Sequence, residues 1–497
     1  MFQSNDENNN KSIEVNALLN AIQTIVSMLF PLISFPYVTR VLGVDNVGKY
    51  SFSNNIVSYF VLLAGLGVST YGIKEGAKYR DNKEAFNIFV KELFSINVVS
   101  TFASIFLLVL CSFLVPKLAN YKTAIFILGF QIIFITFGRG WIFSVFEDYL
   151  FLSVRTIVFY SLSLFLLFLF VRDENDLYIY CIICVVSYFG INILNCFCGR
   201  KYCRYSFDYR INYSHIKPIL LAFGISLSVV IYTASDVTIL GFFYSDRVVG
   251  LYSASVKIYN IVKQILASLL IVTIPRFSYY LGIKEKEKYN NLLCKVANVL
   301  VLVVVPSAVG LFCLSRDCIL LIAGRDYADS TMSLRILSIA IVFNIFAYMF
   351  GYCVLIPNNK EGDFLKVTVI SAVINIFMNL ILIPKFSLNA AAITTLIAEA
   401  FASLLCYKYS LKIIIRFINR KNAIITLIGC LYVLIICLIL KTLIQNNIIA
   451  RLGLTVPLSI IGYLIIHYCL GNGFFIDSTN ELLGMLHKKD KNKRSPL

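Results

Sequence analysis

Long apolar segments recur along the whole of this sequence, and they constrain its fold more than any other feature. Each is close to the roughly 20 residues that an α-helix needs to cross a lipid bilayer. Because backbone polar groups inside a bilayer must be satisfied within the segment, such runs predict transmembrane helices. We expect fourteen of them, approximately at residues 13–36, 50–72, 88–114, 121–142, 149–171, 177–198, 217–242, 250–274, 292–314, 333–356, 364–384, 388–408, 423–445 and 448–470.

The composition agrees with an all-α integral membrane protein. Of the 497 residues, 59% are hydrophobic, and the mean hydropathy is +0.80, which excludes the soluble class. Residues 1–12 are polar and rich in asparagine. We therefore expect no cleaved signal peptide, and the first helix should itself act as the insertion signal.

The net charge of +17 reflects membrane topology rather than a nucleic-acid partner. Of the 44 lysine and arginine residues, all but Lys257 and Lys263 are dispersed among the connections between the apolar segments, and they are not gathered on one soluble face. Most of them fall in one alternating set of connections, which includes both ends of the chain. The positive-inside rule then predicts a multi-pass membrane protein with both termini in the cytoplasm.

Cysteine and histidine give no sign of a metal or disulfide site. Most of the fourteen cysteines lie within apolar segments, and the sequence has only three histidines. Cys181 and Cys184 form a CxxC pattern, but within a membrane helix they are interpreted as small packing residues. We expect no disulfide framework, no metal and no other cofactor.

The stretch from Asp236 to Ser268 is the most informative for function, because charges interrupt its apolar sequence. A charged side chain at the bilayer centre costs roughly 2.5 to 3.5 kcal/mol, so lysines there predict a wet or protein-lined interior. At about 100° per residue, six polar residues of its second half fall within one helical arc of roughly 140°. These residues are Ser253, Lys257, Asn260, Lys263, Gln264 and Ser268.

Two acids within apolar segments are candidates for ion coupling. Asp236 and Lys257 lie about ten residues on either side of a short polar turn, so two antiparallel helices would place them at similar depth. Asp236 is then either a static partner of Lys257 or a carrier of coupled H⁺ or Na⁺. Glu399, with Thr395 and Ser403 one turn to either side, makes either a hydrogen bond between packed helices or a coupling site.

An internal repeat divides the chain. Residues 47–56 align without gaps on residues 249–258 and match at Val, Gly, Tyr, Ser, Ser and Ile. Each match begins at the start of an even-numbered helix, which predicts two parallel six-helix repeats around a central cleft. The expected domains are an N-terminal lobe (1–198), a basic cytoplasmic linker (199–217), a C-terminal lobe (218–410), two extra transmembrane helices (411–470) and a cytoplasmic tail (471–497).

The second helix carries small and polar residues along one face, Asn54 and Asn55 among them. Under the repeat alignment, Asn55 corresponds to Lys257. Such a face either lines the cleft or packs tightly against another helix, because small residues also serve close helix packing in membranes.

Two strings carry a family likeness. PYVTRVLGVDNVGKYSFS from Pro36 and NIFMNLILIPKFSLNAAAITT from Asn375 resemble the signature stretches of Wzx-type O-antigen and capsule repeat-unit flippases. These belong to the polysaccharide transporter family of the multidrug/oligosaccharidyl-lipid/polysaccharide exporter superfamily. The resemblance covers roughly residues 12–410. Ser387 and Asn389-Ala390 stand where glycines are more common in the family, which weakens the turn expected there.

The resemblance implies a substrate, partners and roles for the polar residues. The substrate would be an oligosaccharide on an undecaprenyl diphosphate carrier, moved from the inner to the outer leaflet by alternating access. The implied partners are membrane lipids, a polysaccharide polymerase and chain-length proteins. Lumen cations would face the diphosphate or acidic sugars, and amides would suit sugar hydroxyls. The candidate substrate-binding residues are Lys257, Lys263, Arg40, Asn54, Asn55, Asn260 and Gln264, with Asp236 and Glu399 for ion coupling.

Two other functions compete with a flippase. A membrane enzyme for glycolipids would need catalytic groups in a long outward loop, and the sequence has no Walker A, GxSxG or HExxH motif. We therefore expect no enzyme. A drug or metabolite antiporter of the same superfamily fold stays open as the alternative, and the buried lysines discriminate against it because they would repel a cationic drug.

Overall fold

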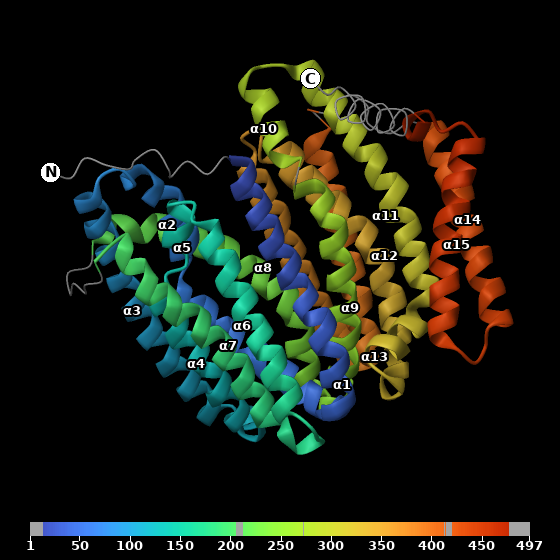
Figure 1. Cartoon of the computed structure of the whole chain (residues 1–497). Coiled ribbons are helices and arrows are strands. Elements are labelled where there is room, and N and C mark those ends of the chain that lie inside the picture. Colours follow the sequence, from blue (N-terminus) through green and yellow to red (C-terminus); the bar gives the residue numbers. More distant parts are fainter. Residues whose placement is uncertain (1–12, 205–211, 272, 412, 414–419, 477–497) are drawn as a thin grey trace, which may run out of the picture. The chain divides into compact units, whose positions relative to one another are not determined.

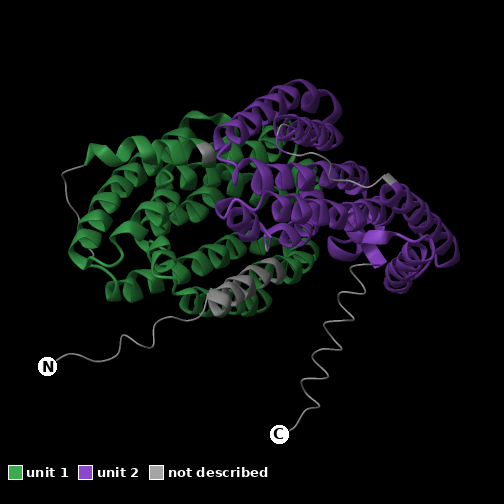
Figure 2. Ribbon diagram, turned by 90° about the horizontal axis from the view of Figure 1, so that it is seen from above, with its two compact units in different colours: residues 1–253 green, residues 254–497 purple. Residues whose placement is uncertain are grey.

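The computed structural model describes residues 13–204, 212–271, 273–411, 413 and 420–476. Every element within these residues is a helix. The expected cytoplasmic tail lies mostly outside them, and so does the middle of the basic linker. By its contacts the chain forms two compact units, residues 1–253 and 254–497, coloured separately in Figure 2. The lobe boundaries drawn from the repeat stay a prediction.

The first unit is built around α1, which packs against α3, α4, α6 and α8. Helix α4 also packs on α7, and α6 on α7 (Figure 1). The helices of this unit are α1 (Ile13–Gly65), α2 (Val68–Gly76), α3 (Lys83–Leu114), α4 (Lys122–Gly138), α5 (Trp141–Val145), α6 (Tyr149–Phe170), α7 (Leu177–Cys198), α8 (Ile216–Phe243) and the first two turns of α9 (Asp246–Ile271).

The second unit contains the rest of α9, and its core is the packing of α12 on α11 and α13. Helices α14 and α15 form a hairpin that packs on α11. Its further helices are α10 (Ile274–Gly282), α11 (Lys286–Ile322), α12 (Thr331–Tyr348), a π-helical extension (Met349–Leu355), α13 (Glu361–Ser410), α14 (Arg420–Leu443) and α15 (Ile448–Cys469).

Twelve helices within the described residues are long and apolar enough to cross a membrane. Two of them, α1 and α13, each cover two of the fourteen expected segments, because the chain turns within them at a residue with non-helical backbone. That residue is Gly43 in α1 (φ 73°, ψ 175°) and Ser387 in α13 (φ 58°, ψ −140°). The fold class predicted from the apolar segments is confirmed, and the chain turns at Ser387, where the sequence analysis expected a weakened turn.

The repeated motif forms a reciprocal contact inside the first unit. A Cβ added to Gly48 would lie 1.9 Å from the carbonyl oxygen of Asp246, and one added to Gly250 would lie 2.1 Å from that of Val44. Gly250 is the repeat counterpart of Gly48, and Asp246 is the counterpart of Val44. In each copy, the glycine contacts the backbone at the position just before the other copy's motif. Only glycine permits backbones to approach this closely.

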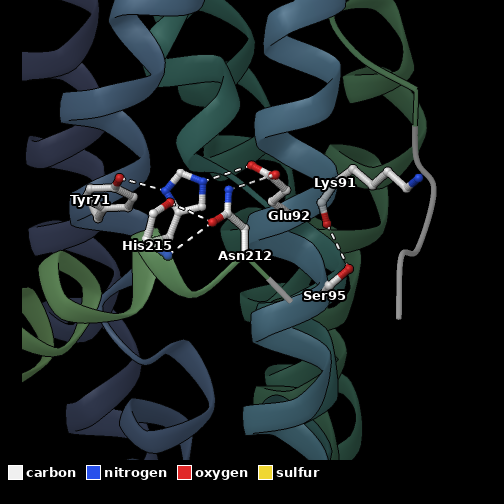
Figure 3. Close-up of polar contacts among 7 residues, drawn as sticks. Tyr71, Lys91, Glu92, Ser95, Asn212 and His215 are labelled. Carbon is white, nitrogen blue, oxygen red and sulfur yellow. Dashed lines mark hydrogen bonds and ion pairs between the residues drawn. The ribbon is translucent and has the colours of Figure 1, made fainter. Parts of the chain in front are cut away.

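Polar contacts join the end of the basic linker, just before α8 begins, to α2 and α3 (Figure 3). The buried ring of His215 bonds through Nδ1 to the Tyr71 hydroxyl and through Nε2 to the Glu92 carboxylate, both at 2.9 Å. Asn212 donates to the other Glu92 oxygen at 3.0 Å. One carboxylate thus fixes both residues at the start of α8.

Candidate functional site

A polar cluster lies among three helices of the second unit. Tyr259 and Lys263 are one turn apart on α9 and so share a helix face. The Tyr259 hydroxyl donates to Oε1 of Glu399 on α13 at 3.4 Å, and Nδ2 of Asn344 on α12 donates to the same oxygen at 2.7 Å. Glu399 is buried, with 3% of its surface exposed. The carboxylate is therefore held by donors from two neighbouring helices.

Lys263 supplies positive charge to this cluster. Its Nζ lies 5.0 Å from the centre of the Tyr259 ring, within range of a cation–π contact, and the Glu399 carboxylate attracts it electrostatically. A buried carboxylate is tolerated where hydrogen bonds and an opposite charge compensate for lost hydration. The structure thus places Lys263 within electrostatic range of Glu399, although the sequence placed the two residues in separate roles.

Tyr259 and Asn344 are members of the cluster that the sequence analysis missed. Tyr259 is buried, four residues before Lys263, and Asn344 interrupts the apolar segment 333–356. The signal for Asn344 was a polar amide within a membrane helix, which needs a partner on another helix. The sequence could not tell which helix supplies it.

Asp236 occupies a separate site in the first unit. It is buried on α8, and its Oδ2 accepts a hydrogen bond of 2.7 Å from the Tyr252 hydroxyl. Tyr252 is one of the matching positions of the repeat, and its counterpart Tyr50 donates to the Cys184 thiol at 3.6 Å. Asp236 and Lys257 fall in different compact units, so their pairing stays a prediction.

The polar face of the second half of α1 packs against α8. Asn55 donates from Nδ2 to the carbonyl oxygen of Ala234 at 2.9 Å, and the hydroxyls of Tyr59 and Thr238 lie 3.0 Å apart. The Asn55 amide nitrogen therefore serves helix packing, one of the two roles left open for this face.

The remaining candidate residues differ in their exposure. Asn54, Lys257 and Asn260 are half-buried, whereas Gln264 is exposed. Arg40 is also exposed, and its Nη1 donates to the carbonyl oxygen of Pro36 on its own helix at 2.6 Å. The substrate-binding roles of these residues stay predictions.

An apolar cavity of about 460 Å³ lies in the second unit among α9, α11, α14 and α15. The α14–α15 hairpin that closes it is fixed to α11 by a buried ion pair, in which Arg451 Nε donates to Asp317 Oδ2 at 2.8 Å. The walls include Val262, Pro306, Gly310, Leu314, Val433 and Tyr463.

Among the described residues, no three His, Cys, Asp or Glu side chains are grouped so as to hold a metal ion.

Known proteins resemble this chain in sequence and in fold. A protein of Escherichia coli (strain K12) whose name assigns it to O-antigen transport is 23% identical over 80% of this chain and 96% of its own length. The capsular polysaccharide biosynthesis protein CapF of Staphylococcus aureus is 22% identical over 79% of this chain and 97% of its own. The structure resembles the lipid II flippase MurJ in an inward closed conformation, with a TM-score of 0.75 and 14% identity. That match covers 92% of this chain and 99% of MurJ.

A multidrug transporter of the MATE family, in an inward-facing conformation, also has a similar fold, with a TM-score of 0.58 and 12% identity. It matches 80% of this chain and 98% of its own length. The E. coli relative and both of these solved structures are named as transport proteins. Residues 14–281, more than half of the chain, match the family described as polysaccharide biosynthesis protein. The chain therefore belongs to that family.

Proposed function

We propose that this protein is a flippase for an oligosaccharide linked to undecaprenyl diphosphate. It would act in the bacterial plasma membrane, with both termini in the cytoplasm, and move its substrate from the inner to the outer leaflet by alternating access. Family membership and the names of the relatives support the substrate class. The observation that carries the proposal is the cluster of Lys263, Tyr259, Asn344 and Glu399, an ionisable network within membrane helices.

Lys263 is suited to a phosphate because an ammonium group binds phosphate oxygens as a point charge. While Glu399 is ionised, it attracts Lys263 and competes with a phosphate for that charge. A proton or sodium ion on Glu399 would weaken this attraction and leave Lys263 available to the substrate. Ion binding and substrate binding would then favour each other, and such coupling is reciprocal.

The apolar cavity beside α14 and α15 offers a place for part of the polyprenyl tail. Burial of apolar surface is favourable by about 25 cal/mol per Å² removed from water, and a tail segment inside the cavity would stay shielded during transport of the head. The two C-terminal helices, which the repeat does not include, would thereby gain a role in substrate binding.

The direct test is the leaflet distribution of the undecaprenyl diphosphate-linked oligosaccharide in cells that lack this protein. A membrane-impermeant reagent labels sugars on the outer leaflet only. Accumulation on the cytoplasmic face, relieved by the wild-type gene and not by a Lys257→Ala, Lys263→Ala variant of equal abundance, is the expected result. An unchanged distribution would refute the flippase.

The second candidate is a drug or metabolite antiporter of the same fold, which the buried Glu399 carboxylate favours because it could bind a cation. Efflux of a fluorescent cationic dye separates the two functions. A dye gradient that depends on Glu399, together with an unchanged glycolipid distribution, would establish the antiporter instead.

A further inference from the structure

The first unit contains a cavity of about 330 Å³ lined by side chains of α1, α6 and α7. None of the candidate binding or coupling residues lines it, whereas Cys184, which accepts the hydrogen bond from Tyr50, does. Its walls combine one cation with hydroxyl groups and aromatic rings, including Ser34, Arg155, Thr156, Tyr160, Ser187 and Tyr188. This mixture differs from the apolar lining of the cavity in the second unit.

Arg155 lines this cavity as a buried cation with no ion-pair partner among the described residues. Only 9% of its surface is exposed, and its Nε and Nη1 make no hydrogen bond with any described residue. The ring of Phe151 lies 5.8 Å from its Cζ, near the limit of a useful cation–π contact. Burial of an unpaired charge costs free energy because the charge loses its hydration. A guanidinium stays protonated in proteins, so Arg155 cannot avoid this cost by losing its charge.

Arg451 shows how the same side chain is accommodated elsewhere in the described part of the chain. It is buried to the same degree, with 8% exposed, but it forms an ion pair with Asp317 and donates to the carbonyl oxygen of Ile444 at 2.7 Å. The charge of Arg451 is compensated within the protein. That of Arg155 requires a compensating group from outside the described residues, since a buried unpaired charge is strongly unfavourable.

The rest of the cavity wall is suited to a sugar. The hydroxyls of Tyr160 and Tyr188 have no hydrogen-bond partner among the described side chains, and the Tyr160 ring stacks on Phe30 at 4.5 Å. Hydroxyl groups can exchange hydrogen bonds with sugar hydroxyls, and an aromatic face can cover the apolar face of a sugar ring. The volume is at the lower end of the range for small-molecule sites, which fits a single sugar unit.

We propose that this cavity binds an acidic sugar, with its carboxylate or phosphate on the Arg155 guanidinium. A planar guanidinium can donate two parallel hydrogen bonds to either oxyanion. The proposal rests on the proposed function, since it assigns an acidic unit to the transported oligosaccharide. It also places a sugar subsite inside the first unit, separate from the lysine of the second.

The test is calorimetric titration of the purified full-length protein with glucuronate, glucose 6-phosphate, inorganic phosphate, glucose and sodium chloride. We expect glucuronate or glucose 6-phosphate to bind, and whichever binds more tightly identifies the oxyanion. Glucose should bind at least tenfold more weakly. The Arg155→Met variant should lose about tenfold to a hundredfold in affinity, which corresponds to a charge-assisted hydrogen bond. The matched control is Arg172→Gln, two residues beyond the end of α6 and exposed, which should bind as the wild type does.

Thermal unfolding without ligand gives a second readout. Arg155→Met should unfold at the same or a higher temperature than the wild type, because it removes an unpaired buried charge. Equal binding by Arg155→Met and wild type, equal responses to glucuronate and chloride, or no binding of any acidic sugar would each overturn the proposal. Leaflet labelling does not probe this cavity directly, so acidic-sugar binding with an unchanged leaflet distribution would refute the flippase and leave the sugar site standing.

Discussion

At the scale of single residues, the buried carboxylate of Glu399 shows what a membrane interior demands of an ionisable group. Two donors and one cation from the surrounding helices compensate for the water it has lost. Such a network gives Lys263 a structural role as well as the binding role proposed for it. The two roles can be separated experimentally because stability and transport respond differently to paired substitutions.

We expect Lys263→Ala to lower both stability and transport. The change removes a cation that attracts Glu399, at a cost of up to about 3 kcal/mol of unfolding free energy. The double variant Lys263→Ala, Glu399→Gln should recover most of this stability but not transport. Thermal unfolding and leaflet labelling measure the two effects, with the exposed Lys288→Ala as control. Full transport by the single variant at normal abundance would exclude Lys263 from substrate binding.

The turn residues Gly43 and Ser387 lead to opposite predictions. Both have positive φ in a region that is costly for a residue with Cβ, by about 1–3 kcal/mol. Glycine costs only about 0.5–1 kcal/mol in unfolded-state entropy. Ser387→Gly should therefore stabilise the protein by about 1 kcal/mol, and Gly43→Ala should destabilise it by a similar amount. Thermal unfolding in detergent checks both signs, and a lower melting temperature for Ser387→Gly would contradict this account.

At the scale of secondary-structure elements, the repeat is visible as a contact and not only as an alignment. Gly48 and Gly250 each face a backbone carbonyl next to the other copy of the motif. The sequence match identified both glycines. That the two copies contact each other reciprocally became clear only from the structure, because a pairwise alignment contains no distances.

We expect Gly48→Ala and Gly250→Ala to destabilise the protein by similar amounts, about 1–3 kcal/mol each, because either added methyl group forces the same backbones apart. Their effects should be less than additive, since separating the backbones once relieves both clashes. Gly224→Ala is the control, because no atom lies within 4 Å of its added Cβ. Equal melting temperatures for Gly48→Ala and the control would show that the contact does not limit stability.

At the scale of the whole molecule, the C-terminal hairpin of α14 and α15 lies outside the two six-helix repeats that the sequence predicts. The buried Asp317–Arg451 pair fixes this hairpin to α11 beside the apolar cavity. The sequence identified α14 and α15 as additional helices but assigned them no function. Their packing gives the proposed lipid tail a binding surface.

Filling the apolar cavity should slow transport without loss of stability. Gly310 lines it, and no atom lies within 4 Å of an added Cβ, so Gly310→Leu projects an isobutyl group into the cavity. We expect the transport rate to fall by about tenfold, equivalent to about 1.4 kcal/mol of tail binding. Gly453→Leu on α15 is the control, since its surroundings are equally open and it does not line the cavity. Equal transport by both variants would exclude the cavity as a tail site.

The sequence by itself determined the fold class, the transmembrane segments, the repeat and the family, because each depends on local hydrophobicity or on short ordered strings. It also identified Lys263 and Glu399 as charges that need a protein environment. Only the tertiary structure decided that these two charges interact electrostatically, that Tyr259 and Asn344 bond to Glu399, and that Asn55 bonds to α8. It alone also showed that Arg155, which the sequence analysis did not single out, lines a hydroxyl-rich cavity. The reason is physical: hydropathy specifies which segments enter the membrane, whereas the partner of a polar side chain depends on how distant helices pack.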